Sequence, residues 1–116
     1  MANWFKISEF SCPCCGQNHI SPALVAMLQR ARTESGVPFV INSGYRCNKH
    51  NKEIKGSKKS SHLNGLAVDI RCRDNQERDR ILTGLFAANF HRIGIADTFI
   101  HADIDYSKLA SCWLYR

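Results

Sequence analysis

The sequence has no long hydrophobic run. No segment approaches the roughly 20 consecutive apolar residues that cross a bilayer, and the stretch from Met1 to Phe10 lacks the apolar core of a secretory signal. We therefore expect no integral membrane association and synthesis in the cytoplasm. If the substrate lies outside the membrane, in the periplasm or cell wall, some other process must release the protein to it.

Acidic residues are few relative to basic ones. The 10 Asp and Glu residues against 16 Lys and Arg residues give a formal net charge of +6 and a pI near 9.2. This balance favours an anionic partner, such as nucleic acid, an anionic lipid surface or a cell-wall polymer. Much of the excess lies in one stretch between Arg46 and His62, which contains Lys49, Lys52, Lys55, Lys58 and Lys59. That stretch is either a polyanion site or a solvated loop.

Internal repeats, low-complexity tracts and long linkers are also absent. With 44% hydrophobic and 22% charged residues, the composition is that of a globular protein. A second core would leave each half of the 116 residues too small to bury enough apolar surface. We therefore predict one domain over residues 1–116.

Cysteine is not scarce, yet the sequence offers only part of a familiar cysteine site. Cys12 and Cys15 have the C-x-x-C spacing of half a structural zinc site, but no second such pair follows. Four ligands would require His19 or the other cysteines, which are Cys14, Cys47, Cys72 and Cys112. Buried thiols, a disulfide formed after release and a structural metal are all open interpretations.

Two segments carry helix signals. A serine-proline pair at 21–22 is a typical helix start, apolar residues recur at helical spacing and Gly36 supplies a stop, which predicts a helix over residues 22–35. Asp74, with a glutamate three residues later, starts a second helix whose apolar face continues to Phe90.

Four segments are predicted as strands from their alternating or β-branched composition. They cover residues 37–42, 65–71, 93–96 and 99–104, the last two joined as a hairpin. Residues 43–61 carry no apolar periodicity and are predicted to form a long loop. We expect an α+β domain with a mainly antiparallel sheet and two helices packed on it.

One group of residues could support metal chemistry. His62 ends the predicted loop and precedes a strand that presents Asp69, and Gly65 allows a sharp turn between them. His101 lies in another predicted strand, where it shares a face with Asp103. Two imidazoles and one carboxylate suit a catalytic zinc that lowers the pKa of a bound water and polarises an amide carbonyl. Spacing alone does not separate such a site from histidines that are hydrogen-bonded in a core.

Several motifs follow one another along the chain. Ser43-Gly44-Tyr45-Arg46-Cys47 is followed by S-x-H-x-x-G-x-A-x-D-I over residues 60–70, by Gly94-Ile95, and by F-I-H-x-D-I over residues 99–104. Together with F-x-C-x-C-C-G over residues 10–16, this set resembles the zinc D-Ala-D-Ala carboxypeptidase family, peptidase family M15. The likeness covers nearly the whole chain and is nearest to short phage peptidoglycan peptidases.

The resemblance implies a fold like that of the hedgehog and DD-peptidase domains. It implies zinc bound by three residues, His62, Asp69 and His101. It also implies that Arg46 meets a substrate carboxylate or the developing oxyanion, a role that suits the fixed fork of guanidinium donors. A structural salt bridge is the alternative for that arginine. Tyr45 and Ser60, which belong to the matching motifs, would contact substrate.

The proton-transfer residue is where the sequence departs from the family. Many members place an acidic residue three positions before the last zinc-binding histidine, where this chain has Thr98. We expect Asp103 to be the acidic group beside the metal water and Asp97 to be the second candidate. Either carboxylate could instead orient His101 or another ligand, which is the ordinary use of a carboxylate near a metal-bound imidazole.

Three functions are consistent with these features. The first is zinc-dependent hydrolysis of peptidoglycan stem peptides, as in a D-Ala-D-Ala carboxypeptidase or a phage endolysin that acts in host lysis, with the cleaved bond left open. The second is a non-catalytic wall-binding or peptide-binding domain of the same fold, which Thr98 favours. The third is a nucleic-acid-binding zinc module, which we do not expect because no aromatic residues alternate with the lysines. We expect a monomer.

Overall fold

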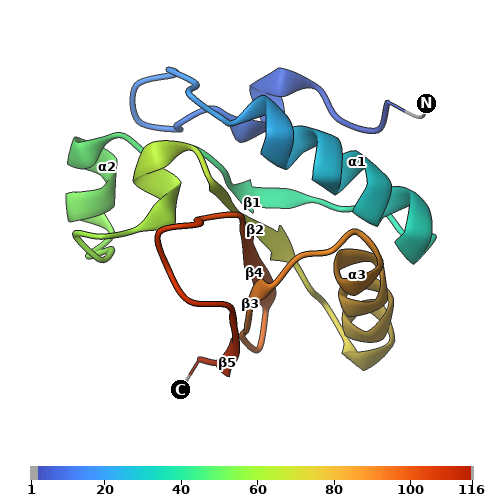
Figure 1. Cartoon of the computed structure of the whole chain (residues 1–116). Helices are drawn as coiled ribbons and strands as arrows, with labels where there is room; N and C mark the ends of the chain where they lie inside the picture. The colour runs from blue at the N-terminus through green and yellow to red at the C-terminus, as the bar shows by residue number, and fades with distance from the viewer. Residues whose placement is uncertain (1–2, 116) are drawn as a thin grey trace.

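The computed structural model describes residues 3–115, which form a five-stranded sheet, three α-helices and two short 3-10 helices (η). In Figure 1, α1 and α3 lie next to each other, whereas α2 lies on the far side of the molecule from α3. No helix in the described part of the chain is long and apolar enough to span a membrane. The elements are η1 (Ile7–Phe10), α1 (Pro22–Ser35), β1 (Ile41–Ser43), α2 (Asn48–Glu53), η2 (Ser61–Asn64), β2 (Ala67–Arg71), α3 (Asn75–Ala87), β3 (Arg92–Ile95), β4 (Phe99–Asp103) and β5 (Ser111–Leu114).

The sheet has the strand order β1-β2-β4-β3-β5. The β1/β2, β2/β4 and β3/β4 pairs are antiparallel, whereas β3 and β5 pair in parallel. The expected hairpin forms between β3 and β4, and Ala96 N–H donates to the Phe99 carbonyl at 3.0 Å across its turn. The predicted α+β class with a mainly antiparallel sheet is confirmed.

α1 and α3 begin at the predicted capping residues. The Ser21 hydroxyl accepts a hydrogen bond from Leu24 N–H at 3.3 Å, and Asp74 Oδ1 accepts one from Glu77 N–H at 2.8 Å. Gly36 ends α1 with φ +72°, a left-handed conformation that suits glycine. The two helices pack against each other and share one hydrophobic core with the sheet, in agreement with the expectation of two helices packed on the sheet.

Two segments differ from the sequence-based expectations. The strand predicted over residues 37–42 is shorter and begins at Ile41, because Pro38 has no N–H to contribute to a ladder. The predicted loop over residues 43–61 contains α2, whose sequence NKHNKE has no apolar periodicity. This helix starts where Cys47 Sγ accepts a backbone N–H of its first turn.

The two faces of the sheet have different environments. Val68 and Ile70 of β2, with Ile100 of β4, are fully buried in one hydrophobic core with residues of α1 and α3. Because side chains alternate along a strand, their neighbours project from the opposite face. That face carries Asp69 and His101, and we call it the polar face of the sheet.

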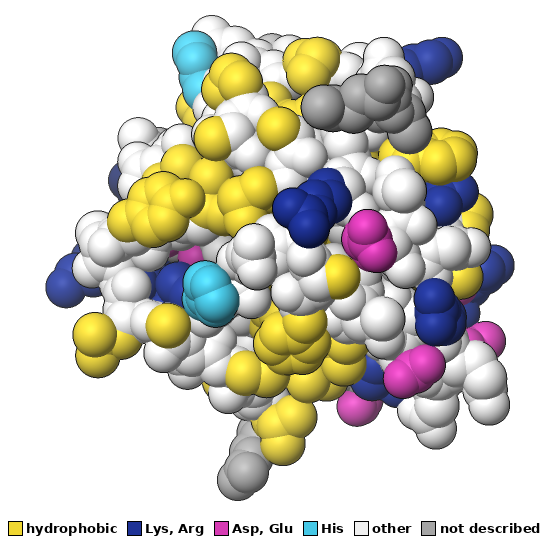
Figure 2. Space-filling view, turned by 45° about the vertical axis from the view of Figure 1, so that its right-hand side comes forward, with side chains coloured by type: hydrophobic (Ala, Val, Ile, Leu, Met, Phe, Trp, Pro, Cys, Tyr) yellow, Lys and Arg dark blue, Asp and Glu magenta, His cyan; other side chains and the backbone are white. Residues whose placement is uncertain are grey.

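Basic side chains are exposed in more than one part of the surface. The five lysines between Arg46 and His62 are all exposed, on α2 and on the loop that follows it. On the side of the molecule shown in Figure 2, Lys and Arg side chains are scattered among neutral and hydrophobic groups. This side therefore has no continuous basic surface of the kind that follows a nucleic-acid backbone.

Candidate metal centre

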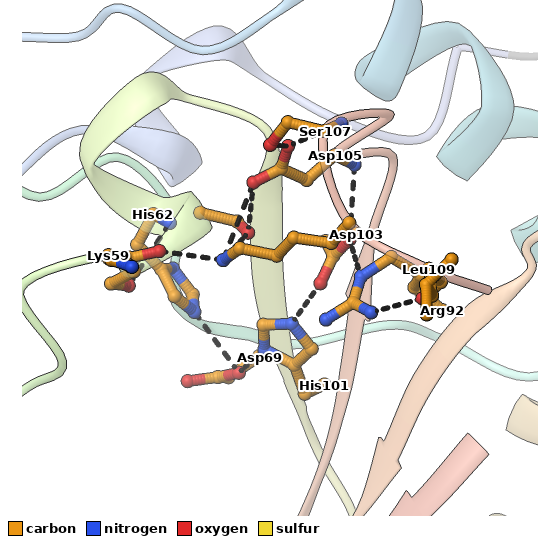
Figure 3. A network of polar contacts seen from close by, with 12 residues as sticks. Lys59, His62, Asp69, Arg92, His101, Asp103, Asp105, Ser107 and Leu109 are labelled. Atoms are coloured by element: carbon orange, nitrogen blue, oxygen red, sulfur yellow. Dashed lines mark hydrogen bonds and ion pairs between the residues drawn. The ribbon is translucent and has the colours of Figure 1, made fainter. Parts of the chain in front are cut away.

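Three side chains from separate elements meet on the polar face of the sheet. His62 is on η2, Asp69 on β2 and His101 on β4, and one ligand atom from each lies within 4.8 Å of the other two. Asp69 and His101 are direct cross-strand partners. Gly65 ends η2 with φ +68° and turns the chain into β2, as its sequence position predicted. Figure 3 shows the three side chains directed toward one another.

The Asp69 carboxylate lies between the two imidazoles. Its Oδ1 is 3.3 Å from His62 Nε2 and 3.0 Å from His101 Nδ1. Bonds of about 2.0–2.2 Å to a tetrahedral zinc would place neighbouring nitrogen and oxygen ligands roughly 3.4 Å apart. The observed spacing therefore suits a small divalent ion with little movement of the side chains.

His62 presents a nitrogen that has no hydrogen-bond partner. Its Nδ1 lies 2.7 Å from the Gly44 carbonyl, and because a carbonyl only accepts, Nδ1 carries the proton. Nε2 is buried and has no hydrogen-bond partner among the described residues. It lies 3.3 Å from Asp69 Oδ1, which is an acceptor. A metal ion bound to both Nε2 and Oδ1 would satisfy the two atoms.

The far side of His101 is held by a second carboxylate. His101 Nε2 lies 2.7 Å from Asp103 Oδ2, and the other oxygen of Asp103 accepts from Arg92 Nε at 2.8 Å and from Asp105 N–H at 3.1 Å. Asp103 is 2% exposed, so these partners enclose nearly all of it. A carboxylate in this position fixes the orientation and basicity of a metal-binding imidazole.

The charges of the site support one another. Burial raises the pKa of Asp69, but the interactions with the neighbouring His101 and His62 more than offset it and hold the pKa of that carboxyl well below its usual range. Burial lowers the pKa of His101, but hydrogen bonds to Asp103 and Asp69 more than offset this effect. The pKa of His101 is therefore raised overall. Burial also raises the pKa of Asp103, and contacts with His101 and Arg92 lower it overall. Both carboxylates therefore stay ionised at neutral pH, as a cation site requires.

Arg46 is held in one orientation beside the three residues. Its Nη2 lies 3.3 Å from Asp69 Oδ2, its Nε donates to Ser43 Oγ at 3.1 Å, and its Nη1 donates to Asn51 Oδ1 at 3.1 Å. It also lines the cavity at the site, so it both forms the salt bridge considered from the sequence and faces any bound ligand. Asn51 was not identified from the sequence, because a lone asparagine in a polar segment carries no signal.

The site lies in a cavity of about 480 Å³. Its basic lining residues are Arg46, Lys59, Arg92 and Lys108, and its aromatic ones are Phe99, Trp113 and Tyr115. The cavity thus combines positive charge with flat apolar surfaces around a group that could hold a metal ion. This arrangement suits an anionic ligand with an extended backbone.

Two of the aromatic lining residues, Trp113 in β5 and Tyr115 directly after it, belong to a strand that was not predicted from the sequence. The Trp113 ring centroid lies 5.4 Å from that of His101, and the Arg92 guanidinium lies 4.9 Å from the Trp113 ring. A Cβ on Gly94 would come within 2.6–2.7 Å of the Tyr115 and Trp113 rings. A glycine inside a predicted strand is the sequence signal for such a close approach.

The other sequence-predicted residues lie in three different places. Ser60 lines the cavity, and its hydroxyl accepts His62 N–H at 3.2 Å. Tyr45 lies edge-on to His19, with ring centroids 4.9 Å apart, and is not among the residues that line the cavity. Asp97 is exposed in the β3–β4 turn and lines a separate depression. The structure therefore brings Ser60 to the site but not the other two.

A buried hydrogen-bond network supports η2 from behind. Ser61 Oγ donates to Asp105 Oδ2 at 2.7 Å, and Lys108 Nζ donates to Ser61 Oγ at 2.8 Å and to the Lys59 carbonyl at 2.6 Å. Burial raises the pKa of Asp105, but hydrogen bonds from Ser107 and Ser61 lower it to about 2. The loop between β4 and β5 thus holds the residue directly before His62.

Comparison with known proteins gives one clear finding. The model of the family described as peptidase M15 matches residues 4–103, which include the three residues at the candidate metal centre and their partner Asp103. A search of curated proteins gives no match. A peptidase family of this kind, together with a group of residues that could bind a metal, points to a metallopeptidase. Because the match covers most of the 116 residues, the chain belongs to the peptidase M15 family.

Proposed function

We propose that the protein is a zinc-dependent peptidase that hydrolyses amide bonds in the stem peptides of peptidoglycan. The observation that carries the proposal is the buried His62 Nε2, which lies 3.3 Å from Asp69 Oδ1 and has no hydrogen-bond partner among the described residues. Two imidazoles and one carboxylate are a ligand set that catalytic zinc uses, with an open fourth position. When bound, zinc activates water for attack and polarises the scissile carbonyl.

The chain's own residues would bind and orient the substrate. The Arg46 guanidinium has five N–H donors, of which three are used by Ser43, Asn51 and Asp69, so two remain for a substrate carboxylate or carbonyl oxygen. Because those three partners already fix the orientation of the guanidinium, the Arg46 side chain loses little conformational entropy when it binds an anion. Trp113 and Phe99 give the substrate backbone a flat apolar surface at the cavity.

The charge around the cavity favours peptidoglycan as the substrate class. Stem peptides carry free carboxylates along their length and at their ends, and the cavity is lined by Arg46, Lys59, Arg92 and Lys108. The Arg92 and Lys108 side chains are already paired with Asp103 and Asp105, so Lys59 and Arg46 have the more direct role. We further propose that the protein reaches the wall after release from the cell that makes it.

We propose that Asp103 positions His101 and does not transfer the proton in catalysis. A general base works best with a pKa near the working pH, and the contacts of Asp103 lower its pKa instead. Asp103→Asn should therefore weaken zinc binding by roughly 10–100-fold, while kcat at saturating zinc stays within a few-fold of the parent value. Zinc titration followed by assays at saturating metal separates the two quantities. A large loss of kcat at saturating zinc would assign proton transfer to Asp103.

Asp97→Asn is the matched control for this experiment. Asp97 was the second candidate for proton transfer, is exposed and lines a different depression, so its replacement should change neither zinc affinity nor kcat. A loss of kcat in this variant would move proton transfer to the β3–β4 turn.

A second candidate function is a non-catalytic domain that binds wall peptides with the same site. It is favoured by one observation: the carboxylates that line the cavity in the described part of the chain are Asp69 and Asp103, and both are engaged by neighbouring side chains. With Thr98 at the position where many M15 members have an acid, no unpaired carboxylate is at hand to accept a proton.

Turnover of a defined substrate separates the two functions. Zinc-loaded protein is incubated with a synthetic stem pentapeptide and with purified peptidoglycan, and the products are identified by mass spectrometry. We expect new amino termini or free D-alanine from the zinc-loaded protein and none after the metal is removed with a chelator. Saturable binding of the pentapeptide without any product would instead support the binding domain. Cleavage that continues after complete metal removal would overturn the zinc proposal.

A further inference from the structure

A second group of potential metal ligands lies apart from the catalytic cavity. Cys12, Cys15 and Cys47 each offer a sulfur that lies within 4.8 Å of the other two. The Sγ atoms of Cys12 and Cys47 are 3.6 Å apart, and none of the three residues lines the cavity that holds His62. The Cys14 sulfur is not part of this group. We call these residues the cysteine cluster.

The loop that carries Cys12 and Cys15 has the backbone of a metal-binding knuckle. Gly16 N–H donates to the Cys12 carbonyl and Cys12 N–H donates to the Gln17 carbonyl, both at 2.8 Å, which closes a tight turn over C-P-C-C-G. Gly16 has φ +72°, so the turn depends on a residue without a side chain there.

A backbone N–H group is directed at one sulfur of the cluster. Cys47 N–H lies 3.5 Å from Cys12 Sγ. A sulfur that accepts a backbone N–H is stabilised as the thiolate, which is the form that binds a metal.

We propose that Cys12, Cys15 and Cys47 bind a second zinc ion with a structural role. Zinc–sulfur bonds of about 2.3 Å place neighbouring sulfurs of a tetrahedral site roughly 3.8 Å apart, close to the 3.6 Å between Cys12 and Cys47. Thiolates favour zinc over the hard cations that prefer oxygen ligands. The three sulfurs leave one position of a tetrahedral site open, and the Cys14 sulfur, which lies outside the group of three, would have to move to fill it.

A disulfide explains the arrangement less well. A disulfide requires sulfurs about 2.05 Å apart, whereas the Sγ atoms of Cys12 and Cys47 are 3.6 Å apart and all six cysteines are free. One bridge would also leave the third sulfur of the cluster without a partner. The Cys47 N–H directed at Cys12 Sγ favours a charged sulfur, which a disulfide does not contain.

The position of the cluster indicates which segments the ion would hold together. Cys47 directly follows Arg46, and Tyr45 N–H donates to the Phe10 carbonyl at 2.8 Å. An ion shared by Cys47 and the 12–15 turn would therefore tie the N-terminal segment to the end of β1. This tie would fix the backbone of Arg46 without touching the catalytic cavity.

Zinc counting on the full-length protein tests the proposal. Protein purified under reducing conditions is analysed for zinc and protein by elemental analysis. We expect two zinc ions per chain in the parent, one in His62→Ala/His101→Ala and one in Cys15→Ser/Cys47→Ser. Cys112→Ser, which changes an exposed cysteine outside the cluster, should retain both. Absence of zinc from His62→Ala/His101→Ala protein that is folded by circular dichroism would overturn the second site.

A measurement on the parent protein keeps the test independent of variant folding. A mercurial that blocks thiols should release one zinc per chain, and cobalt-loaded protein should show the near-ultraviolet absorption of cobalt–thiolate bonds. Zinc that resists the mercurial, or a cobalt spectrum without thiolate bands, would contradict the proposal. Because the proposed catalytic site contains no sulfur ligand, a single zinc that is released by the mercurial supports the cysteine cluster even if the catalytic site is empty.

Discussion

Replacing His62 with alanine is expected to abolish peptide cleavage while leaving the fold intact. The change removes the buried nitrogen that faces Asp69 and leaves two of the three proposed ligands, Asp69 and His101. Loss of a metal that supplies several kcal/mol of transition-state stabilisation lowers kcat/KM by at least about a thousandfold. The measurements are stem-peptide turnover, zinc content and circular dichroism of the same preparation.

His91→Ala is the matched control for this prediction. His91 is exposed, precedes β3 and is not among the residues that line the cavity, so its replacement should leave turnover and zinc content unchanged. The zinc-peptidase proposal fails if His62→Ala protein retains turnover. A variant that is unfolded would be replaced by His62→Gln, which keeps a side chain that can donate to the Gly44 carbonyl.

Replacing Arg46 with alanine is expected to lower kcat/KM by roughly 10²–10³-fold with zinc content retained. The guanidinium is not among the atoms that could bind the metal, but it pairs with Asp69 and faces the cavity. Its loss would remove a preorganised cation from the position where substrate charge lies or develops. Kinetics on a stem peptide and zinc analysis give the two readouts.

Two further variants show which property of Arg46 matters. Arg46→Lys keeps the charge but not the fork, so it should recover only part of the activity. Arg71→Ala removes an exposed arginine at the end of β2, outside the cavity, and should have no effect. Equal activity of Arg46→Ala and the parent would mean that this arginine has only the structural salt bridge.

The elements with strong local signals were predictable from the sequence. The caps at Ser21 and Asp74 specify where α1 and α3 begin, because a side-chain oxygen there satisfies backbone N–H groups that the helix leaves free. The alternation around Asp69 and His101 predicts which face each occupies, since the period of a strand is two. Their direct pairing across β2 and β4 required the fold.

The features that escaped prediction depend on contacts between distant segments. α2 has no apolar face, and it is held partly by Asn51, which donates to the Ser57 carbonyl and accepts from Arg46. β5 pairs in parallel with β3, an arrangement that no short turn signal specifies. The His62 hydrogen bond to the Gly44 carbonyl joins residues 18 positions apart. Every residue has a backbone carbonyl, so the sequence does not show which one accepts a given hydrogen bond.

The alternation along β4 also limits where the chain can change its length. Ile100 and Ala102 are buried in the core, whereas His101 and Asp103 face the cavity. A one-residue insertion before His101 would exchange the two faces of the strand. Apolar side chains would then point into the cavity, and the imidazole and carboxylate would point into the hydrophobic core. Insertions or deletions within residues 54–59 would leave the alternation unchanged. Variation in substrate preference among related chains is therefore expected in the lengths of the loops around the cavity, and not in the strands.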